Sequence, residues 1–154
     1  MKIRKAKNKD FKQVVSIVKE GLKEYGFSYA PKTSESDLKN IKKIYVSSGG
    51  TFLVCETIEN EIIATGGLLR VNMTSYKIRK MYVKKKYQNK GIGKLVLNEL
   101  IKFATTKGAK KIVLETTNEM KAAIKMYQSF GFLISNEKIE SPRCRVSMKL
   151  AVKN

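Results

Sequence analysis

A glycine-containing loop, Gln88-Asn89-Lys90-Gly91-Ile92-Gly93, lies directly between a strand-like run and a helix-like run. The strand-like run covers residues 76–83, and from residue 92 to 107 apolar residues recur at helical spacing. Glycines lack side chains, so backbone N–H groups can approach an anion, and the start of a helix adds further unpaired N–H donors. With the ammonium groups of Lys90 and Lys94 beside it, the loop predicts a site for a phosphorylated ligand.

Two familiar classes of phosphate loop do not fit this stretch. A Walker loop requires serine or threonine after its Gly-Lys pair, but Leu95 follows Gly93-Lys94. A dinucleotide-binding fingerprint requires a third glycine, and Val96 occupies that position. The loop therefore indicates a phosphate site of another class.

The spacing of apolar residues predicts a mixed sheet within one domain, residues 1–154. Elements are expected in the order β-α-α-β-β-β-α-β-α-β-β, and a chain of 154 residues is long enough for one adequate core. The layer rule places helices on both faces of such a sheet, and the unit formed by 76–83, 92–107 and 111–116 makes its two strands parallel. The expected strands are 2–6, 51–57, 62–70, 75–83, 111–116, a short one around residue 134 and 145–150; the expected helices run from 8–10 to about 25, from 34–36 to 48, 92–107 and 120–129.

The strong positive charge invites a nucleic-acid interpretation, which the sequence does not favour. The formal net charge is +19, but the 27 lysines far outnumber the 5 arginines and are scattered over the whole chain. Arginine is the residue that base and phosphate recognition prefers. A nucleic acid is therefore an unlikely partner.

Composition also bears on metals and on cellular setting. The chain has no histidine, and Cys55 and Cys144 show no metal-ligand spacing, so no metal site is expected. No apolar run is long enough to span a bilayer, and no apolar segment follows the basic N-terminal residues 1–7, so we expect neither a membrane span nor a signal peptide. Two isolated thiols then fit a reducing, cytoplasmic setting.

Two motifs resemble those of the GNAT superfamily of N-acetyltransferases. Gln88-x-x-Gly91-x-Gly93 resembles the family signature Q/R-x-x-G-x-G/A, in the same strand-to-helix context. Residues 114–132 resemble the second family motif, with its ending A-I-x-x-Y-x-x-x-G-F read here from Ala123 to Phe132. The element order matches over essentially the whole chain. The resemblance implies a mostly antiparallel sheet with one splayed parallel pair.

The cosubstrate that the resemblance implies is acetyl-coenzyme A. Its pyrophosphate would lie on the N–H groups of residues 89–94, and its pantetheine arm beside the splayed end of the fourth strand. Many relatives have an asparagine in the second motif that contacts the arm; Met120 is at that position here, and Asn118 is a possible replacement. The cofactor-binding residues that follow are Met81, Tyr82, Val83, Gln88, Asn89, Lys90, Gly91, Ile92, Gly93, Lys94 and Asn118.

The resemblance also assigns catalytic roles. Tyr127 matches the tyrosine that protonates the departing thiolate, although its helical phase equally fits a core aromatic. Many relatives carry a glutamate on the fourth strand as general base, but Lys77 is at the corresponding position here. Glu115 is the substitute we name, with a surface ion pair as its alternative role, and Glu24 is a second candidate.

The acceptor pocket is expected to be walled by the loop after the first long helix. Glu24, Tyr25, Phe27 and Tyr29 are the residues that this implies, although the aromatic ones fit loop packing equally well.

The resemblance implies transfer of an acetyl group to an amine by direct attack in a ternary complex. Two alternatives stay open: a non-catalytic acyl-coenzyme A-binding regulatory module, and an RNA- or ribosome-associated protein acetyltransferase. The acceptor is a small-molecule or peptide amine, and the net charge favours acidic or peptide acceptors over polyamines. The protein is expected to be a monomer or a homodimer.

Overall fold

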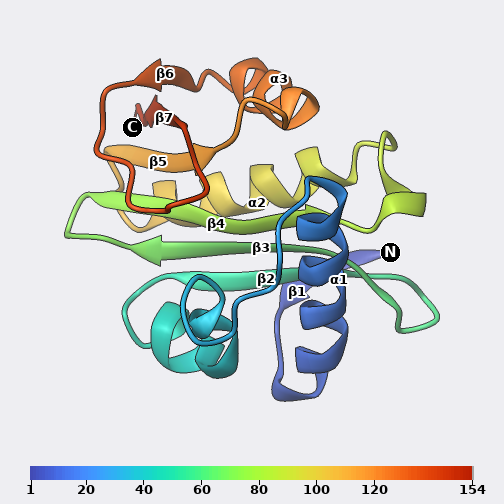
Figure 1. The fold of residues 1–154 in the computed structure, drawn as a ribbon. Coiled ribbons are helices and arrows are strands. Elements are labelled where there is room, and N and C mark those ends of the chain that lie inside the picture. The colour runs from blue at the N-terminus through green and yellow to red at the C-terminus, as the bar shows by residue number, and fades with distance from the viewer. Residues whose placement is uncertain (154) are drawn as a thin grey trace.

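The computed structural model describes residues 1–153, which form a seven-stranded sheet with helices packed on both faces (Figure 1). The strand order is β1-β2-β3-β4-β5-β7-β6, and β4 with β5 is the parallel pair among otherwise antiparallel neighbours. The mixed sheet and its single parallel pair confirm the fold predicted from the sequence. The strands are β1 (Lys2–Lys5), β2 (Thr51–Glu56), β3 (Ile62–Arg70), β4 (Ser75–Val83), β5 (Lys111–Thr116), β6 (Leu133–Ser135) and β7 (Val146–Ala151).

Three α-helices cover the sheet, each close to its predicted range. They are α1 (Phe11–Glu24), α2 (Ile92–Thr106) and α3 (Lys121–Ser129), and short 3₁₀ turns lie at η1 (Asn8–Asp10) and η4 (Lys85–Tyr87). None of the helices within residues 1–153 is both long and apolar enough to cross a membrane.

The prediction of a second α-helix is wrong, because the segment forms helical turns of other types. Residues 36–46 are helical, but they form a 3₁₀ turn, η2 (Ser36–Asn40), followed by a π-helical turn, η3 (Lys42–Val46). The buried Tyr45 lies in the π turn, and its hydroxyl donates a hydrogen bond to Asp37, which is also buried. The helical pitch follows this buried polar contact, which apolar spacing cannot indicate.

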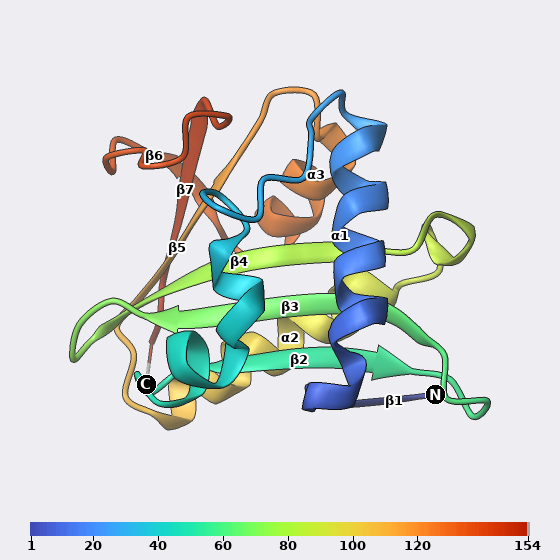
Figure 2. The same cartoon turned by 60° about the horizontal axis from the view of Figure 1, so that its bottom comes forward.

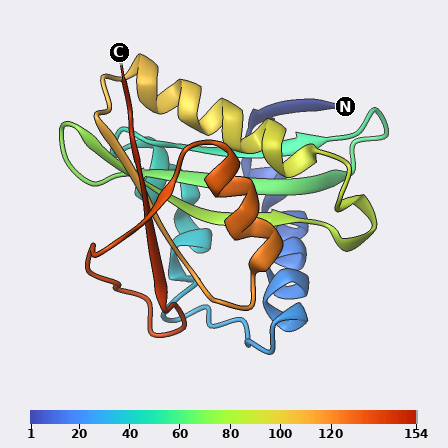
Figure 3. The same cartoon turned by 90° about the horizontal axis from the view of Figure 1, so that it is seen from above.

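The two faces of the sheet bury separate hydrophobic clusters. On one face α1 and the η2–η3 segment pack over β2 and β3, and they lie on the same side in Figure 2. On the opposite face lies α2, and the apolar side chains of α3 pack against the same cluster (Figure 3). Gly21 lets α1 approach the end of β4, because a Cβ at that position would lie 2.2 Å from the Tyr82 ring.

The parallel pair β4–β5 separates after three residue pairs. Pairing runs from Ser75–Lys111 to Lys77–Val113, after which the two strands diverge. β4 continues to Val83 with a bulge against β3, where Lys80 has a left-handed φ of 56°. The edge of β4 beyond Lys77 therefore leaves backbone groups facing the gap, and such groups require partners. The splay predicted from the sequence is confirmed.

Candidate active site

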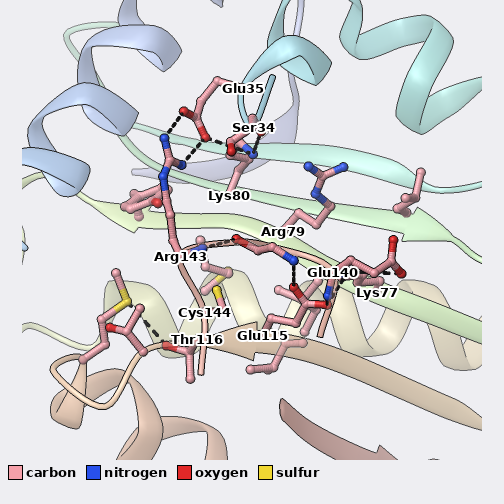
Figure 4. A pocket seen from close by; sticks show the side chains of 18 of the residues that line it. Ser34, Glu35, Lys77, Arg79, Lys80, Glu115, Thr116, Glu140, Arg143 and Cys144 are labelled. Atoms are coloured by element: carbon pink, nitrogen blue, oxygen red, sulfur yellow. Dashed lines mark hydrogen bonds and ion pairs between the residues drawn. The ribbon is translucent and has the colours of Figure 1, made fainter. Parts of the chain in front are cut away.

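A cavity of about 810 Å³ lies where β4 and β5 diverge (Figure 4). The segments that line it include residues 77–82 of β4, residues 114–117 at the end of β5, Tyr127 of α3, residues 33–35 before η2, and the loop 140–144 before β7; Leu22, Phe27, residues 69–71 and Met120 complete the lining. The splay thus opens a space bounded by segments that are far apart in the sequence.

Tyr127 brings a phenol group to this cavity. Its side chain is 6% exposed, and its ring packs edge-on against Phe132 with the centroids 5.7 Å apart. Within residues 1–153 its hydroxyl has no hydrogen-bond partner, and burial, followed by the proximity of Tyr82, raises the pKa of Tyr127. The phenol therefore keeps its proton at neutral pH and has it available for a bound ligand. Both roles considered for Tyr127 are compatible with this position.

Thr117 is a site residue that sequence reasoning missed. It lines the cavity, and its buried Oγ1 has no hydrogen-bond partner in the described part of the chain. Asn118, which was predicted to contact the cofactor, is exposed and does not line the cavity. A buried hydroxyl without a partner is costly, so Thr117 is the better candidate to bind a ligand here. The only indication of this role in the sequence was that Thr117 directly precedes Asn118, the predicted cofactor contact.

The glycine loop has the backbone geometry of an anion cradle. Asn89 and Gly91 have left-handed φ values of 61° and 82°, and Gly91 is the N-cap of α2. The first N–H groups of α2 have no intrahelical acceptor, as at every helix start. Asn89, Lys90 and Lys94 are exposed around these donors. The loop therefore presents helix-start N–H groups beside exposed cations, and phosphate binding there stays a prediction.

The other loop residues have more limited roles. Ile92 is buried in the core, so only its backbone N–H is available to a ligand. Gly93 keeps the helix start close to α3, because a Cβ there would lie 3.2 Å from Met126 Sδ. The Gln88 amide donates a 3.0 Å hydrogen bond to the Val83 carbonyl and so ties the loop to the end of β4.

The end of β4 connects the glycine loop with the cavity. Met81 and Tyr82 line the main cavity, whereas Val83 and Gln88 line a second cavity of about 320 Å³ beside α1. The three strand residues predicted to flank the pantetheine arm therefore run from one cavity to the other.

Of the four residues predicted to wall the acceptor pocket, only Phe27 lines the main cavity. Its ring lies 5.8 Å from the Arg143 guanidinium. Glu24 lines the second cavity instead, and Tyr25 and Tyr29 line neither. The turn after α1 directs their side chains elsewhere, which helical spacing does not reveal.

Glu115 is anchored by three hydrogen bonds. Lys77 Nζ lies 2.8 Å from its carboxylate, and the N–H groups of Glu140 and Ser141 donate to it at 2.9 and 3.0 Å. Burial by itself would raise the pKa of Glu115, but these bonds outweigh it and lower that pKa below its usual range. A carboxylate that already accepts three hydrogen bonds and has a lowered pKa is poorly suited to take a proton. This weighs against the predicted role of Glu115 as general base.

A second ionic group lies across the cavity from Glu115. Glu35, which is 2% exposed, accepts hydrogen bonds of 2.8 and 2.9 Å from Arg143. The Lys80 ammonium lies 3.7 Å from Glu35 and 3.3 Å from Asp37. Burial would raise the pKa of Glu35, but the hydrogen bonds from Arg143 and from the Ala30 N–H lower it overall. This group joins the segment before η2, the β4 bulge and the loop before β7.

Together these features suit a long ligand with phosphate at one end and amides along its length. The helix start and lysines match the phosphates, and the free edge of β4 and the Thr117 hydroxyl match the amides. Such a ligand would end near Tyr127.

Comparison with known proteins gives a consistent result. The model of the acetyltransferase (GNAT) family matches residues 15–132. Human N-acetyltransferase 8B is 30% identical over 103 residues, which cover 63% of this chain and 45% of that protein. The chain therefore spans about half the length of the curated relatives that it matches most strongly.

Solved structures show the same fold. A GNAT-family acetyltransferase from Staphylococcus aureus superimposes with a TM-score of 0.91 at 22% identity, covering 99% of both chains. A phosphinothricin acetyltransferase from Sinorhizobium meliloti, solved in complex with acetyl-coenzyme A, superimposes with a TM-score of 0.78 at 16% identity, covering 98% of this chain and 88% of that one.

Proposed function

The chain belongs to the GNAT family of acetyltransferases, and on this premise we propose that it transfers an acetyl group from acetyl-coenzyme A to an amine. Acetyl transfer from this cosubstrate is the general activity of the family. One observation carries the proposal: the splay of β4 and β5 opens a cavity that holds Tyr127 and communicates along residues 81–83 with the glycine loop.

The proposed donor site follows the end of β4. N–H groups of residues 89–94 would bind the pyrophosphate, with Lys90 and Lys94 balancing its charge. The unpaired edge of β4 and Thr117 Oγ1 would hold the amides of the arm. When bound, acetyl-coenzyme A supplies an activated acyl group on a sulfur that leaves as thiolate.

Tyr127 is the proposed proton donor to that sulfur. Its raised pKa keeps the phenol protonated throughout the neutral range. A positioned donor of this kind contributes roughly 10²- to 10⁴-fold to a rate. Tyr82, whose pKa burial also raises, lies near enough to affect Tyr127 and helps to keep this part of the cavity uncharged.

Direct attack by the amine remains the proposed route. Cys144, a cavity residue that the sequence did not single out, is the thiol nearest to this chemistry. Burial raises the pKa of Cys144, so little of it is present as the nucleophilic thiolate at neutral pH. This supports a ternary complex over an acyl-enzyme.

Deprotonation of the amine is proposed to occur without a dedicated carboxylate base. Glu35 and Glu115 are both ion-paired and have lowered pKa values, and Glu24 lines the second cavity, apart from Tyr127. A water molecule or the solvent would then accept the proton. Glu115 is proposed to position the loop 140–144 instead.

The lack of a free base also keeps a non-catalytic acyl-coenzyme A-binding module as the second candidate. The test is the release of coenzyme A thiol in the presence of an amine panel. Amine-dependent release that falls at least 100-fold in Tyr127→Phe supports catalysis. Tight acetyl-coenzyme A binding with no release above buffer for any amine supports the binding module.

The setting is proposed to be cytoplasmic, with a small-molecule or peptide amine as partner and no nucleic acid, in a monomer or homodimer. Cys55 and Cys144 are free thiols, as a reducing compartment requires. Localisation of the tagged protein to an oxidising compartment would contradict the cytoplasmic setting. RNA binding that survives physiological salt would contradict the exclusion of nucleic acid.

A further inference from the structure

Most charged side chains in the main cavity belong to two ion-paired groups. Glu35 and Asp37 face Lys80 and Arg143 on one side, so two carboxylates meet two cations. On the other side the Lys77 ammonium lies 2.8 Å from the Glu115 carboxylate and 3.8 Å from the Glu140 carboxylate. The first group is neutral and the second has one carboxylate in excess, so each cation in these groups already has an acidic partner.

Two arginines of the cavity, Arg70 and Arg79, lie outside these groups, and Arg70 has hydrogen-bond partners that Arg79 lacks within residues 1–153. Arg79 lines the cavity between Lys77 and Lys80 in sequence, is partly buried, and has no ion pair or side-chain hydrogen bond to any residue of 1–153. Figure 4 shows its side chain apart from both networks of dashed lines. It also lies close enough to Lys80 to lower the pKa of that lysine, after the larger effect of burial.

The β4 bulge explains why three cations gather on one face of a single strand. Tyr76 and Ile78 pack into the cluster under α2, so Lys77 and Arg79 point to the opposite face. The extra residue of the bulge, Lys80 with φ 56°, turns to that face as well and reaches Asp37. Arg79 is therefore surrounded by cations whose acids are already engaged.

We infer that Arg79 binds a carboxylate of the acceptor, so that the substrate is an amine that also carries a carboxylate, such as an amino acid. This inference rests on the proposed function. A partly buried guanidinium without a counter-ion is unfavourable until an anion reaches it. Its planar fork matches a carboxylate in bidentate geometry, which a lysine ammonium does not.

The donor phosphates are a poorer match for Arg79. They are assigned to the glycine loop, which follows the far end of β4, and Val83 rather than Arg79 lines the cavity beside Gln88. Arg70, the other arginine without an acidic partner at the cavity, directs its Nε to the Asn72 carbonyl and its Nη2 to Met73 Sδ. Arg79 is thus the cation that an acceptor entering the cavity would meet.

The experiment compares matched amines that differ only in the carboxylate. Phenylalanine, its amide and phenethylamine, and the corresponding leucine set, are assayed by thiol release with wild type, Arg79→Gln, Arg79→Lys and Arg70→Gln. We expect wild type to favour the amino acids by roughly 10- to 100-fold in kcat/KM, mostly through KM. Arg79→Gln should abolish that preference, Arg79→Lys should keep part of it, and Arg70→Gln should retain it.

Controls separate this inference from the proposed function. Acetyl-coenzyme A binding, measured by calorimetry, should be unchanged in Arg79→Gln, and the thermal unfolding midpoint should not fall, because the substitution removes an uncompensated charge. No thiol release with any amine overturns the proposed function itself. Release without a carboxylate preference, or a preference that Arg79→Gln leaves intact, overturns only the role of Arg79. Weaker acetyl-coenzyme A binding in Arg79→Gln would assign the arginine to the donor and likewise overturn it.

Discussion

The guanidinium of Arg143 donates hydrogen bonds of 2.8 and 2.9 Å to the carboxylate of Glu35, 108 residues earlier in the chain. The same guanidinium donates a 2.6 Å hydrogen bond to the Ser28 carbonyl. These contacts bring the loop before β7 onto the segment before η2 and close one side of the main cavity. Arg143 and Glu35 are therefore expected to stabilise the fold and the cavity wall together.

Glu35→Gln should destabilise the protein in a pH-dependent way. The pKa of Glu35 is lowered in the folded protein from its ordinary value of 4.5, so its charge stabilises above that value and loses its effect as pH falls through the folded pKa. We expect a loss of about 3 kcal/mol at pH 7, since breaking a buried ion pair leaves Arg143 and Lys80 undercompensated. Denaturant unfolding at pH 7 and over a series of lower pH values that ends below the folded pKa of Glu35 measures this difference.

The two proteins should converge in stability at the lowest pH of the series, where Glu35 is protonated and resembles glutamine. Glu99→Gln is the matched control, because Glu99 pairs with Lys102 on the exposed surface of α2 and should cost less than about 1 kcal/mol. An equal loss at pH 7 and at the lowest pH would show that the effect is one of packing.

Tyr127→Phe should lower kcat by roughly 10²- to 10⁴-fold while leaving acetyl-coenzyme A affinity nearly unchanged, because only the proton donor is removed. Steady-state kinetics and calorimetry give the two quantities. Tyr76→Phe is the control: Tyr76 is also buried in β4 but does not line the cavity. Full turnover of Tyr127→Phe at every pH would leave Tyr127 as a core aromatic.

Lys90→Gln combined with Lys94→Gln should weaken acetyl-coenzyme A binding roughly 2- to 10-fold, since each exposed cation contributes modestly. S-acetylpantetheine lacks the pyrophosphate, so its KM should not change. Binding of acetyl-coenzyme A to the variant should also depend less on salt. Lys102→Gln, on the exposed surface of the same helix, is the control. A matching loss for S-acetylpantetheine would contradict phosphate binding by this loop.

Glu115→Gln should preserve the pH dependence of kcat/KM. The lowered pKa of Glu115 leaves it ionised throughout the neutral range, so the rise in rate toward alkaline pH reports deprotonation of the amine instead. We expect a several-fold higher acceptor KM, because the loop 140–144 loses its anchors on the carboxylate. A kcat reduced more than 100-fold with a flattened pH profile would instead restore Glu115 as the general base.

Local sequence patterns were sufficient for most of the fold and for the position of the glycine loop between β4 and α2. The glycine loop, the strand at 75–83 and α2 are each determined by residues close together in the sequence. Glycines mark the turn, alternating apolar residues mark the strand, and apolar residues at helical spacing mark the helix. The splay of β4 from β5 was accessible for the same reason, once the family resemblance was combined with the βαβ order.

The acceptor side was determined by tertiary structure. Glu35 and Arg143 meet only because the sheet brings two distant loops together, and neither residue belongs to a periodic pattern. The bulge at Lys80 places Arg79 and Lys80 on one face, where simple alternation would separate them. Thr117 lines the cavity in preference to Asn118 because of how the chain turns after β5.

The sequence alone thus determined the family, the sheet and the phosphate loop, because each is encoded in short-range spacing. The tertiary structure decided which charges are neutralised in the cavity and which remain available. Ion pairs depend on distances between side chains from separate segments, and these distances are set only when the strands register and the loops pack. That is why Glu115 is anchored, whereas Arg79 lines the cavity without an ion pair to any residue of 1–153.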